Sequence, residues 1–173
     1  LLDALTGLQN RNSYKKAVQA FDNTEAASMA CVYVDANGLH ELNNHQGHEA
    51  GDVMLKTVAH ILLGHFNQEE VFRIGGDEFV ALLTGISAKE GGVECAKRLC
   101  EAVGSMEDPN LGGLRLSCSI GGAICPKDGT DYDTLFVKAD TAAYEAKRLG
   151  KNRYVFYTPG LELKNGYCTS SMS

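Results

Sequence analysis

A short connection between two strand-like runs is the feature of this sequence that most limits its fold. The runs 71–74 and 79–83 are rich in apolar and strand-forming residues, and only Gly75, Gly76, Asp77 and Glu78 separate them. Parallel strands need a crossover of a dozen or more residues, so these two strands pair antiparallel as a hairpin. The sequence therefore predicts a β-hairpin with two carboxylates in its turn.

Helical and strand patterns alternate around this hairpin. Apolar runs predict a buried strand over 29–34, a half-buried strand of period two over 114–120 and a last strand over 154–157. Apolar residues at three- and four-residue intervals predict helices over about 12–21, 39–45, 49–63, 89–103 and 133–149, the first capped by Asn12 or Ser13. This order predicts an α+β fold with a central, mainly antiparallel sheet flanked by helices.

Composition and charge exclude several classes of protein. The 173 residues are 44% hydrophobic and 22% charged, which is typical of one globular domain. No apolar run approaches the roughly 20 residues of a membrane span. The net charge of −6 argues against nucleic acid as a partner. Six cysteines without C-x-x-C spacing predict buried free thiols in a reducing cytosol rather than a zinc site or disulfides.

Three acidic residues suggest a metal site. Asp35 lies where the predicted strand 29–34 ends, and Asp77 and Glu78 lie in the hairpin turn. If the two strands are neighbours, these carboxylates converge, and oxygen ligands are what Mg²⁺ prefers. The alternative is that Gly-Gly-Asp-Glu is only a tight turn, and for four residues alone that alternative is at least as strong.

Three further signals are weaker, and each has an ordinary structural alternative. The segment 37–39 opens a predicted helix, where backbone N–H groups can bind an anion. Asn43 and Asp52 suit the hydrogen-bonding edge of guanine, although Asp52 also suits a helix cap. Lys147 and Lys151 share one face of a predicted helix, where they can hold phosphates or offset the helix dipole.

Taken together, these motifs resemble the GGDEF domain, the catalytic module of bacterial diguanylate cyclases. The resemblance covers about Asp3 to Tyr157 and predicts a catalytic domain over 1–158, followed by a polar, loosely ordered tail over 159–173. The matching segments are Asp3 to Leu8 with Asn10-Arg11, Asp35 to Asn43, Gly47-His48 with Gly51-Asp52, Arg73 to Phe79, Ser119 to Gly121, Ala139-Asp140, Ala143 to Lys147 and Gly150 to Arg153.

The resemblance implies a fold and a reaction. The fold is the palm-like one shared with nucleotidyl cyclases and polymerases. The reaction condenses two GTP into cyclic di-GMP and two pyrophosphates. The 3′-hydroxyl of each GTP attacks the α-phosphate of the other at a two-fold homodimer interface, with two Mg²⁺ or Mn²⁺ ions per active site. The family also implies a cytoplasmic module controlled by an N-terminal sensory or receiver domain outside this chain, in a longer and in some cases membrane-bound protein.

The resemblance also assigns roles to individual residues. Asp35, Asp77 and the backbone carbonyl of Ala36 would bind metal, and Glu78 would act at the same centre as a ligand or proton acceptor. The residues expected to bind substrate are Asn37, Gly38, Leu39, His40, Asn43, Asp52, Gly75, Gly76, Lys147 and Lys151.

The chain departs from the family pattern at several positions. His40 replaces a phosphate-facing Lys and lacks a fixed positive charge near pH 7, while Lys151 replaces Arg and loses its bidentate geometry. The family's product-inhibition motif, Arg-x-x-Asp, is replaced by Phe66, Asn67, Gln68 and Glu69, so we expect no inhibition site for the product.

Several alternatives to an active cyclase remain. His40 keeps open a catalytically weak or inactive GTP-binding regulatory domain. A cyclic di-GMP receptor is disfavoured by the missing Arg-x-x-Asp. Relaxed base choice is disfavoured by Asp52, because adenine has no matching donors on its edge. A purely structural interaction module would require every acidic and Gly-Gly match to be coincidence.

Overall fold

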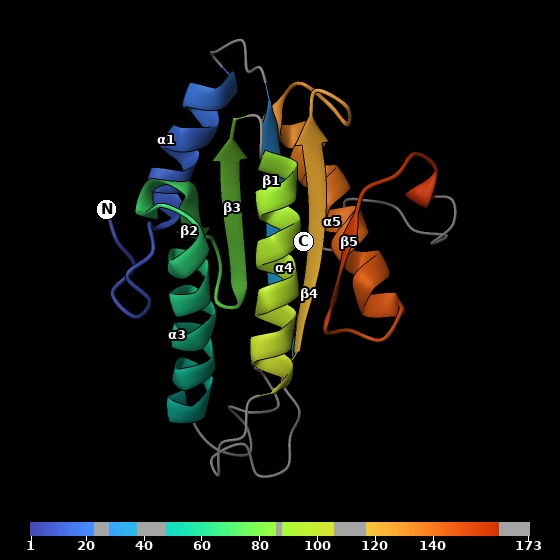
Figure 1. The fold of residues 1–173 in the computed structure, drawn as a ribbon. Helices are drawn as coiled ribbons and strands as arrows, with labels where there is room; N and C mark the ends of the chain where they lie inside the picture. The colour runs from blue at the N-terminus through green and yellow to red at the C-terminus, as the bar shows by residue number, and fades with distance from the viewer. Residues whose placement is uncertain (23–27, 38–47, 86–87, 106–116, 163–173) are drawn as a thin grey trace.

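A computed structural model of the chain describes residues 1–22, 28–37, 48–85, 88–105 and 117–162 (Figure 1). Its centre is a five-stranded sheet in the order β2-β3-β1-β4-β5. The strands are β1 (Met29–Asn37), β2 (Val71–Arg73), β3 (Glu78–Thr84), β4 (Ser117–Cys125) and β5 (Arg153–Phe156). Neighbours pair antiparallel except for β4 and β5, which are parallel. The predicted mainly antiparallel sheet and the β2–β3 hairpin are therefore confirmed.

Helices cover both faces of this sheet. They are α1 (Arg11–Asp22), α3 (His48–His65), α4 (Ala88–Gly104) and α5 (Tyr132–Arg148), with a short 3₁₀ helix, η1 (Gln68–Glu70). Buried residues of α3 and α4 pack on one face of the sheet, and those of α5 with part of α1 pack on the other. Figure 1 shows α3 and α4 in front of the strands and α5 behind them. We call these the α3/α4 face and the α1/α5 face.

The strand β4 differs from its prediction. Its period-two pattern predicted a half-buried strand, but residues 118–123 are all buried. Helices lie against both of its faces, and two glycines allow close contacts with α5 and with Phe156 of β5. A Cβ on Gly121 would overlap the backbone carbonyl of Ala139 in α5, and one on Gly122 would overlap the ring of Phe156. Polar Ser119 is therefore buried with its apolar neighbours.

Two helix ends also differ from the predicted positions. The helix α1 begins at Arg11, and the side chain of Asn10 accepts a hydrogen bond from the Ser13 N–H at 3.1 Å. Asn10 is therefore the cap, in place of Asn12 or Ser13. The helix α5 begins after Asp131, whose side chain accepts from the Thr134 N–H at 3.0 Å. The helix predicted over 39–45 lies outside the described residues.

The remaining expectations concern the tail, the thiols and membrane segments. Leu161 is buried, and the Tyr157 hydroxyl donates to Glu162 at 2.6 Å, so these two residues of the predicted tail contact the domain. Residues 163–173 lie outside the description.

Five cysteines of the described residues are buried and free, as predicted: Cys31, Cys95, Cys100, Cys118 and Cys125. None of the helices described is both long enough and apolar enough to cross a bilayer.

Candidate active site

The pairing of β1 with β3 brings the predicted carboxylates together. Asp35 is the register partner of Glu78, and the Ala36 N–H donates to the Asp77 carbonyl at 2.9 Å. The end of β1 and the turn before β3 therefore meet at one edge of the sheet, toward the lower end in Figure 1. We call residues Gly75–Glu78 the acidic turn. The two strands are neighbours, which is the condition under which the sequence predicted that these carboxylates converge.

The backbone of Ala36 offers a further oxygen at this edge. The N–H and carbonyl of one strand residue point to the same side, so the Ala36 carbonyl also faces Asp77. Within the described residues, the reciprocal bond from the Asp77 N–H to this carbonyl is absent. Ala36 is only 2% exposed, so its carbonyl is a buried oxygen without that backbone donor.

The electrostatics of the turn suit a divalent cation. Burial, and next the negative charge of Asp35, raise the pKa of Asp77 above its ordinary value. Glu78 adds to this effect, and Lys147 opposes it. A cation between Asp35 and Asp77 would remove this repulsion. The described residues contain no group of three His, Cys, Asp or Glu side chains arranged to hold a metal. The metal-binding role of Asp35, Asp77 and the Ala36 carbonyl therefore stays a prediction.

Lys147 brings a positive charge to the same place. Its Nζ donates to Asp35 Oδ2 at 2.7 Å, which joins α5 to the end of β1. Lys151 does not share a helix face with it, because α5 ends at Arg148 and the chain then turns. Lys151 itself has φ 63° and is exposed. The predicted shared face is therefore wrong, and Lys147 alone is placed at the carboxylates.

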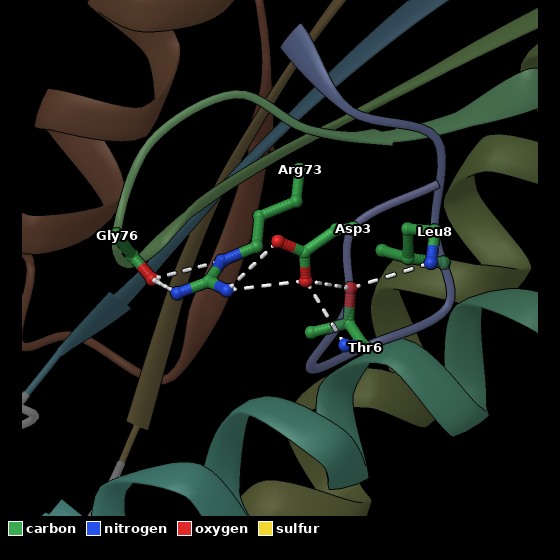
Figure 2. A network of polar contacts seen from close by, with 5 residues as sticks. All are labelled: Asp3, Thr6, Leu8, Arg73 and Gly76. Carbon is green, nitrogen blue, oxygen red and sulfur yellow. Dashed lines mark hydrogen bonds and ion pairs between the residues drawn. The ribbon is translucent and has the colours of Figure 1, made fainter. Parts of the chain in front are cut away.

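An arginine holds the acidic turn from the side of β2 (Figure 2). The guanidinium of Arg73 donates to the Gly76 carbonyl at 2.8 Å and to Asp3 Oδ2 at 3.1 Å. Asp3 also accepts from the N–H and hydroxyl of Thr6, at 2.9 and 2.7 Å. Burial raises the pKa of Asp3, but the hydrogen bonds from Thr6 and Arg73 outweigh it and lower the pKa overall. The N-terminal turn and the acidic turn are thus one hydrogen-bonded unit.

Glu78 lies in a different environment from Asp77. Its carboxylate accepts a hydrogen bond from the hydroxyl of Tyr33, on the α1/α5 face. Burial and the adjacent Glu78 raise the pKa of this hydroxyl above its usual range, so it stays protonated and donates. A Cβ on Gly75 would overlap Glu78 Oε1. A larger residue at position 75 would therefore require the Glu78 carboxylate to move.

Sequence reasoning missed the residues that hold the turn. Asp3 and Arg73 appeared only as parts of matching motifs, and Tyr33 appeared only as part of a strand. Period two along β1 places Tyr33 and Asp35 on the same face and was the available signal. For Arg73 and Asp3, which are 70 residues apart, no local pattern exists.

Other predicted site residues lie elsewhere or outside the description. Asp52 lies in the second turn of α3, which begins at His48, so it is not the helix cap. It is half-buried, and its role toward guanine stays a prediction. Gly38, Leu39, His40 and Asn43 fall outside the described residues, as does the side chain of Asn37.

The window of the product-inhibition motif has structural roles. Phe66 is 6% exposed within the core of the α3/α4 face. Asn67 is the N-cap residue of η1, and its N–H donates to Glu70 Oε1 at 2.8 Å. These roles leave no arginine or aspartate here for a ligand.

Comparisons with known proteins identify the family. A family model described as "Diguanylate cyclase, GGDEF domain" matches residues 1–153, and the chain belongs to this GGDEF family. It is 31% identical over 160 residues to the diguanylate cyclase DgcS of Shewanella oneidensis, covering 89% of this chain and 52% of that protein. It is also 31% identical over 164 residues to the cyclic di-GMP phosphodiesterase PdeR of Escherichia coli, covering 91% of this chain and 24% of that protein.

A solved structure shows the same fold. The isolated GGDEF domain of TpbB (YfiN) from Pseudomonas aeruginosa has a TM-score of 0.80 and 24% identity, with 96% of this chain and 99% of that chain covered. The palm-like cyclase fold is therefore confirmed. The chain spans 52% and 24% of the lengths of DgcS and PdeR, about half or less of each relative.

Proposed function

We propose that this domain is a diguanylate cyclase, which condenses two GTP into cyclic di-GMP and two pyrophosphates. The observation that carries the proposal is the meeting of Asp35 and Asp77 beside the Ala36 carbonyl, where burial and the negative charge of Asp35 raise the pKa of Asp77. Membership of the GGDEF family supports the same reaction. Each domain holds one GTP, so the product forms between two copies that face each other.

Three groups at this edge would hold two Mg²⁺ or Mn²⁺ ions: the carboxylates of Asp35 and Asp77 and the Ala36 carbonyl. When bound, such metals supply activation of the 3′-hydroxyl and neutralisation of the phosphate charge. The protein contributes mainly position. The acidic turn is held rigidly by Arg73, so Asp77 keeps one orientation while two large substrates approach.

Lys147 and the substrate-binding residues would act on GTP itself. The ammonium of Lys147, now on Asp35, would bind phosphate oxygens of the incoming nucleotide. Asp52, with Asn43, would accept the donor groups of guanine, and the backbone of 37–40 would hold phosphates. Gly75 and Gly76 would let the nucleotide approach the turn closely, and Lys151 would add positive charge.

One family relative justifies keeping a second candidate. PdeR is named as a phosphodiesterase, although this chain matches 24% of its length. A domain of this fold can therefore belong to a protein whose name describes another activity. The second candidate is a catalytically weak or inactive domain that binds GTP and regulates an attached partner.

The test is product formation by the purified domain at high concentration with GTP and Mg²⁺, followed by chromatography of the nucleotides. We expect cyclic di-GMP from the wild type and at least a 100-fold slower rate from Asp77→Ala, since a metal-binding carboxylate is removed. Asp133→Ala is the matched control, because Asp133 is an exposed carboxylate in the first turn of α5. GTP binding without product, even when dimers are enforced by cross-linking, would favour the regulatory candidate.

A further inference from the structure

We infer that Tyr33 is a positioning residue for the acidic turn: its hydroxyl holds the Glu78 carboxylate, and Glu78 in turn fixes the backbone that presents Asp77. Glu78 then acts through the turn and not as a metal ligand or proton acceptor. The inference rests on the proposed function for the metal that Asp77 would bind. It differs from the role that the family resemblance implied for Glu78.

Tyr33 is itself held rigidly. It is 5% exposed in the middle of the sheet, and its ring meets the ring of Phe136 from α5 edge-on at 5.3 Å. A buried aromatic ring between a strand and a helix has little rotational freedom. Its hydroxyl therefore donates from a fixed point, and the charged acceptor on Glu78 makes this a strong class of hydrogen bond.

Glu78 is fixed at both its side chain and its backbone. One carboxylate oxygen accepts from Tyr33, and the other lies against the Cα of Gly75. Its backbone carbonyl accepts from the N–H of Ile74 at 3.0 Å. The Glu78 side chain therefore closes the turn from inside, and Asp77 is the residue held between these fixed points.

Glu78 lines a cavity together with other residues that contact the acidic turn. A cavity of about 200 Å³ on the α1/α5 face is lined by Arg11, Tyr14, Tyr33, Ile74, Glu78, Phe136 and Asp140. Neither Asp35 nor Asp77 lines it. Arg11 donates to the Ile74 carbonyl at 2.6 Å from the same side. The cavity thus contains charged groups beside the turn, and Asp35, the register partner of Glu78, lies on the same face of the sheet.

The experiment compares two Tyr→Phe variants at this cavity. Tyr33→Phe removes the hydroxyl that holds Glu78 and keeps the ring. Tyr14→Phe is the matched control, because the Tyr14 hydroxyl pairs with that of Tyr132 at 2.5 Å and the ring lines the same cavity. Thermal unfolding and circular dichroism establish that both variants fold.

The first measurement is binding of Mn²⁺ in the presence of a non-hydrolysable GTP analogue, followed by the electron paramagnetic resonance signal of free Mn²⁺. We expect Tyr33→Phe to weaken Mn²⁺ binding about tenfold, as loss of an outer contact to a metal site typically does. Tyr14→Phe should stay within about twofold of the wild type. Equal Mn²⁺ affinity of the two variants overturns the inference.

A double-mutant cycle makes the assignment to Glu78 specific. If Tyr33 acts only through Glu78, Tyr33→Phe has no further effect on Mn²⁺ affinity in a Glu78→Ala background. Glu78→Gln should lose less affinity than Glu78→Ala, because its amide oxygen still accepts from Tyr33. Equal losses from Gln and Ala, with an additive effect of Tyr33→Phe, identify Glu78 as a ligand and overturn the inference.

Failure of the inference and failure of the proposed function give different results. Product formation by the wild type, with Tyr33→Phe and Tyr14→Phe alike in Mg²⁺ dependence, removes the inference and leaves the cyclase. Absence of product from the wild type removes the cyclase, and a selective loss of Mn²⁺ affinity in Tyr33→Phe still supports the inference.

Discussion

The two faces of the sheet differ in chemistry, although the same strands form both. The buried cluster on the α3/α4 face is built from apolar and thiol side chains, including Met54, Leu62 and Leu99. The α1/α5 face has buried or half-buried charged groups among its apolar residues, including Asp35 and Glu78. Both faces therefore bury apolar side chains, and the α1/α5 face also supports charged groups.

The division follows from the alternation of side chains along a strand. In β1, Val32, Val34 and Ala36 belong to the α3/α4 cluster, while Tyr33 and Asp35 point to the other side. Charged groups are tolerated there because each has a partner: Lys147 for Asp35, and Tyr33 for Glu78. The comparison suggests that changes on the α3/α4 face alter stability, and that changes near the partners alter activity.

The largest expected effect comes from Gly121, where α5 packs directly on β4. Gly121→Val would place side-chain atoms on the backbone of α5 at Ala139 and Ala143, which cannot move aside. We expect a loss of more than about 4 kcal/mol of unfolding free energy, measured by urea denaturation. Gly64→Ala is the control, since Gly64 has open space in α3 and should gain about 0.5–1 kcal/mol. Equal stabilities would contradict the close packing.

The α3/α4 face should affect stability alone. Leu99 of α4 is 0% exposed, so Leu99→Ala should cost about 2–5 kcal/mol of unfolding free energy through the cavity that it leaves. The rate of cyclic di-GMP formation per folded molecule, at a temperature where the variant stays folded, should match the wild type. A tenfold slower rate in the folded variant would break the proposed division between the faces.

Replacement of Arg73 should lower both the stability of the domain and its rate of product formation. Arg73→Lys keeps the charge but cannot donate to Gly76 and Asp3 together, so we expect a loss of about 1–3 kcal/mol of unfolding free energy. The rate of product formation should fall about tenfold, because the acidic turn is less firmly held. Arg98→Lys is the matched control: its pair with Glu94 is exposed, and its stability should change by less than about 0.5 kcal/mol.

The ionised carboxylate of Asp77 should lower the stability of the folded domain. Because its pKa is raised in the folded domain, its ionised form disfavours folding, and this penalty disappears as the pH falls through its folded pKa toward the ordinary value of 3.8 and below. Asp77→Asn should therefore raise Tm slightly at pH 7 without metal, and the gain should vanish near pH 3. A lower Tm at pH 7 would contradict the assigned repulsion with Asp35.

The smallest expected effect is that of added cyclic di-GMP on the initial rate of its own formation. Phe66 is buried and Asn67 caps η1, so this window holds neither residue of the inhibition motif. Added cyclic di-GMP should leave the initial rate within about twofold of its value without product. A steep loss of rate at low product concentration would show an inhibition site elsewhere.

The sequence by itself determined the hairpin and the mainly antiparallel sheet, and it predicted that Asp35 and Asp77 converge if their strands are neighbours. These follow from local rules, since a four-residue connection enforces antiparallel pairing and a strand that ends in an acid presents it at the sheet edge. The motifs were also sufficient to identify the family that the comparisons confirmed.

Only the tertiary structure decided which groups hold the site in place. Arg73 meets Asp3 across 70 residues, Tyr33 meets Glu78 across 45, and Lys147 meets Asp35 across 112. Burial of β4 on both faces likewise depended on α5 and Phe156 packing against its glycines. Such contacts depend on how separate elements pack against one another. The spacing of residues along the chain does not show which distant elements will meet.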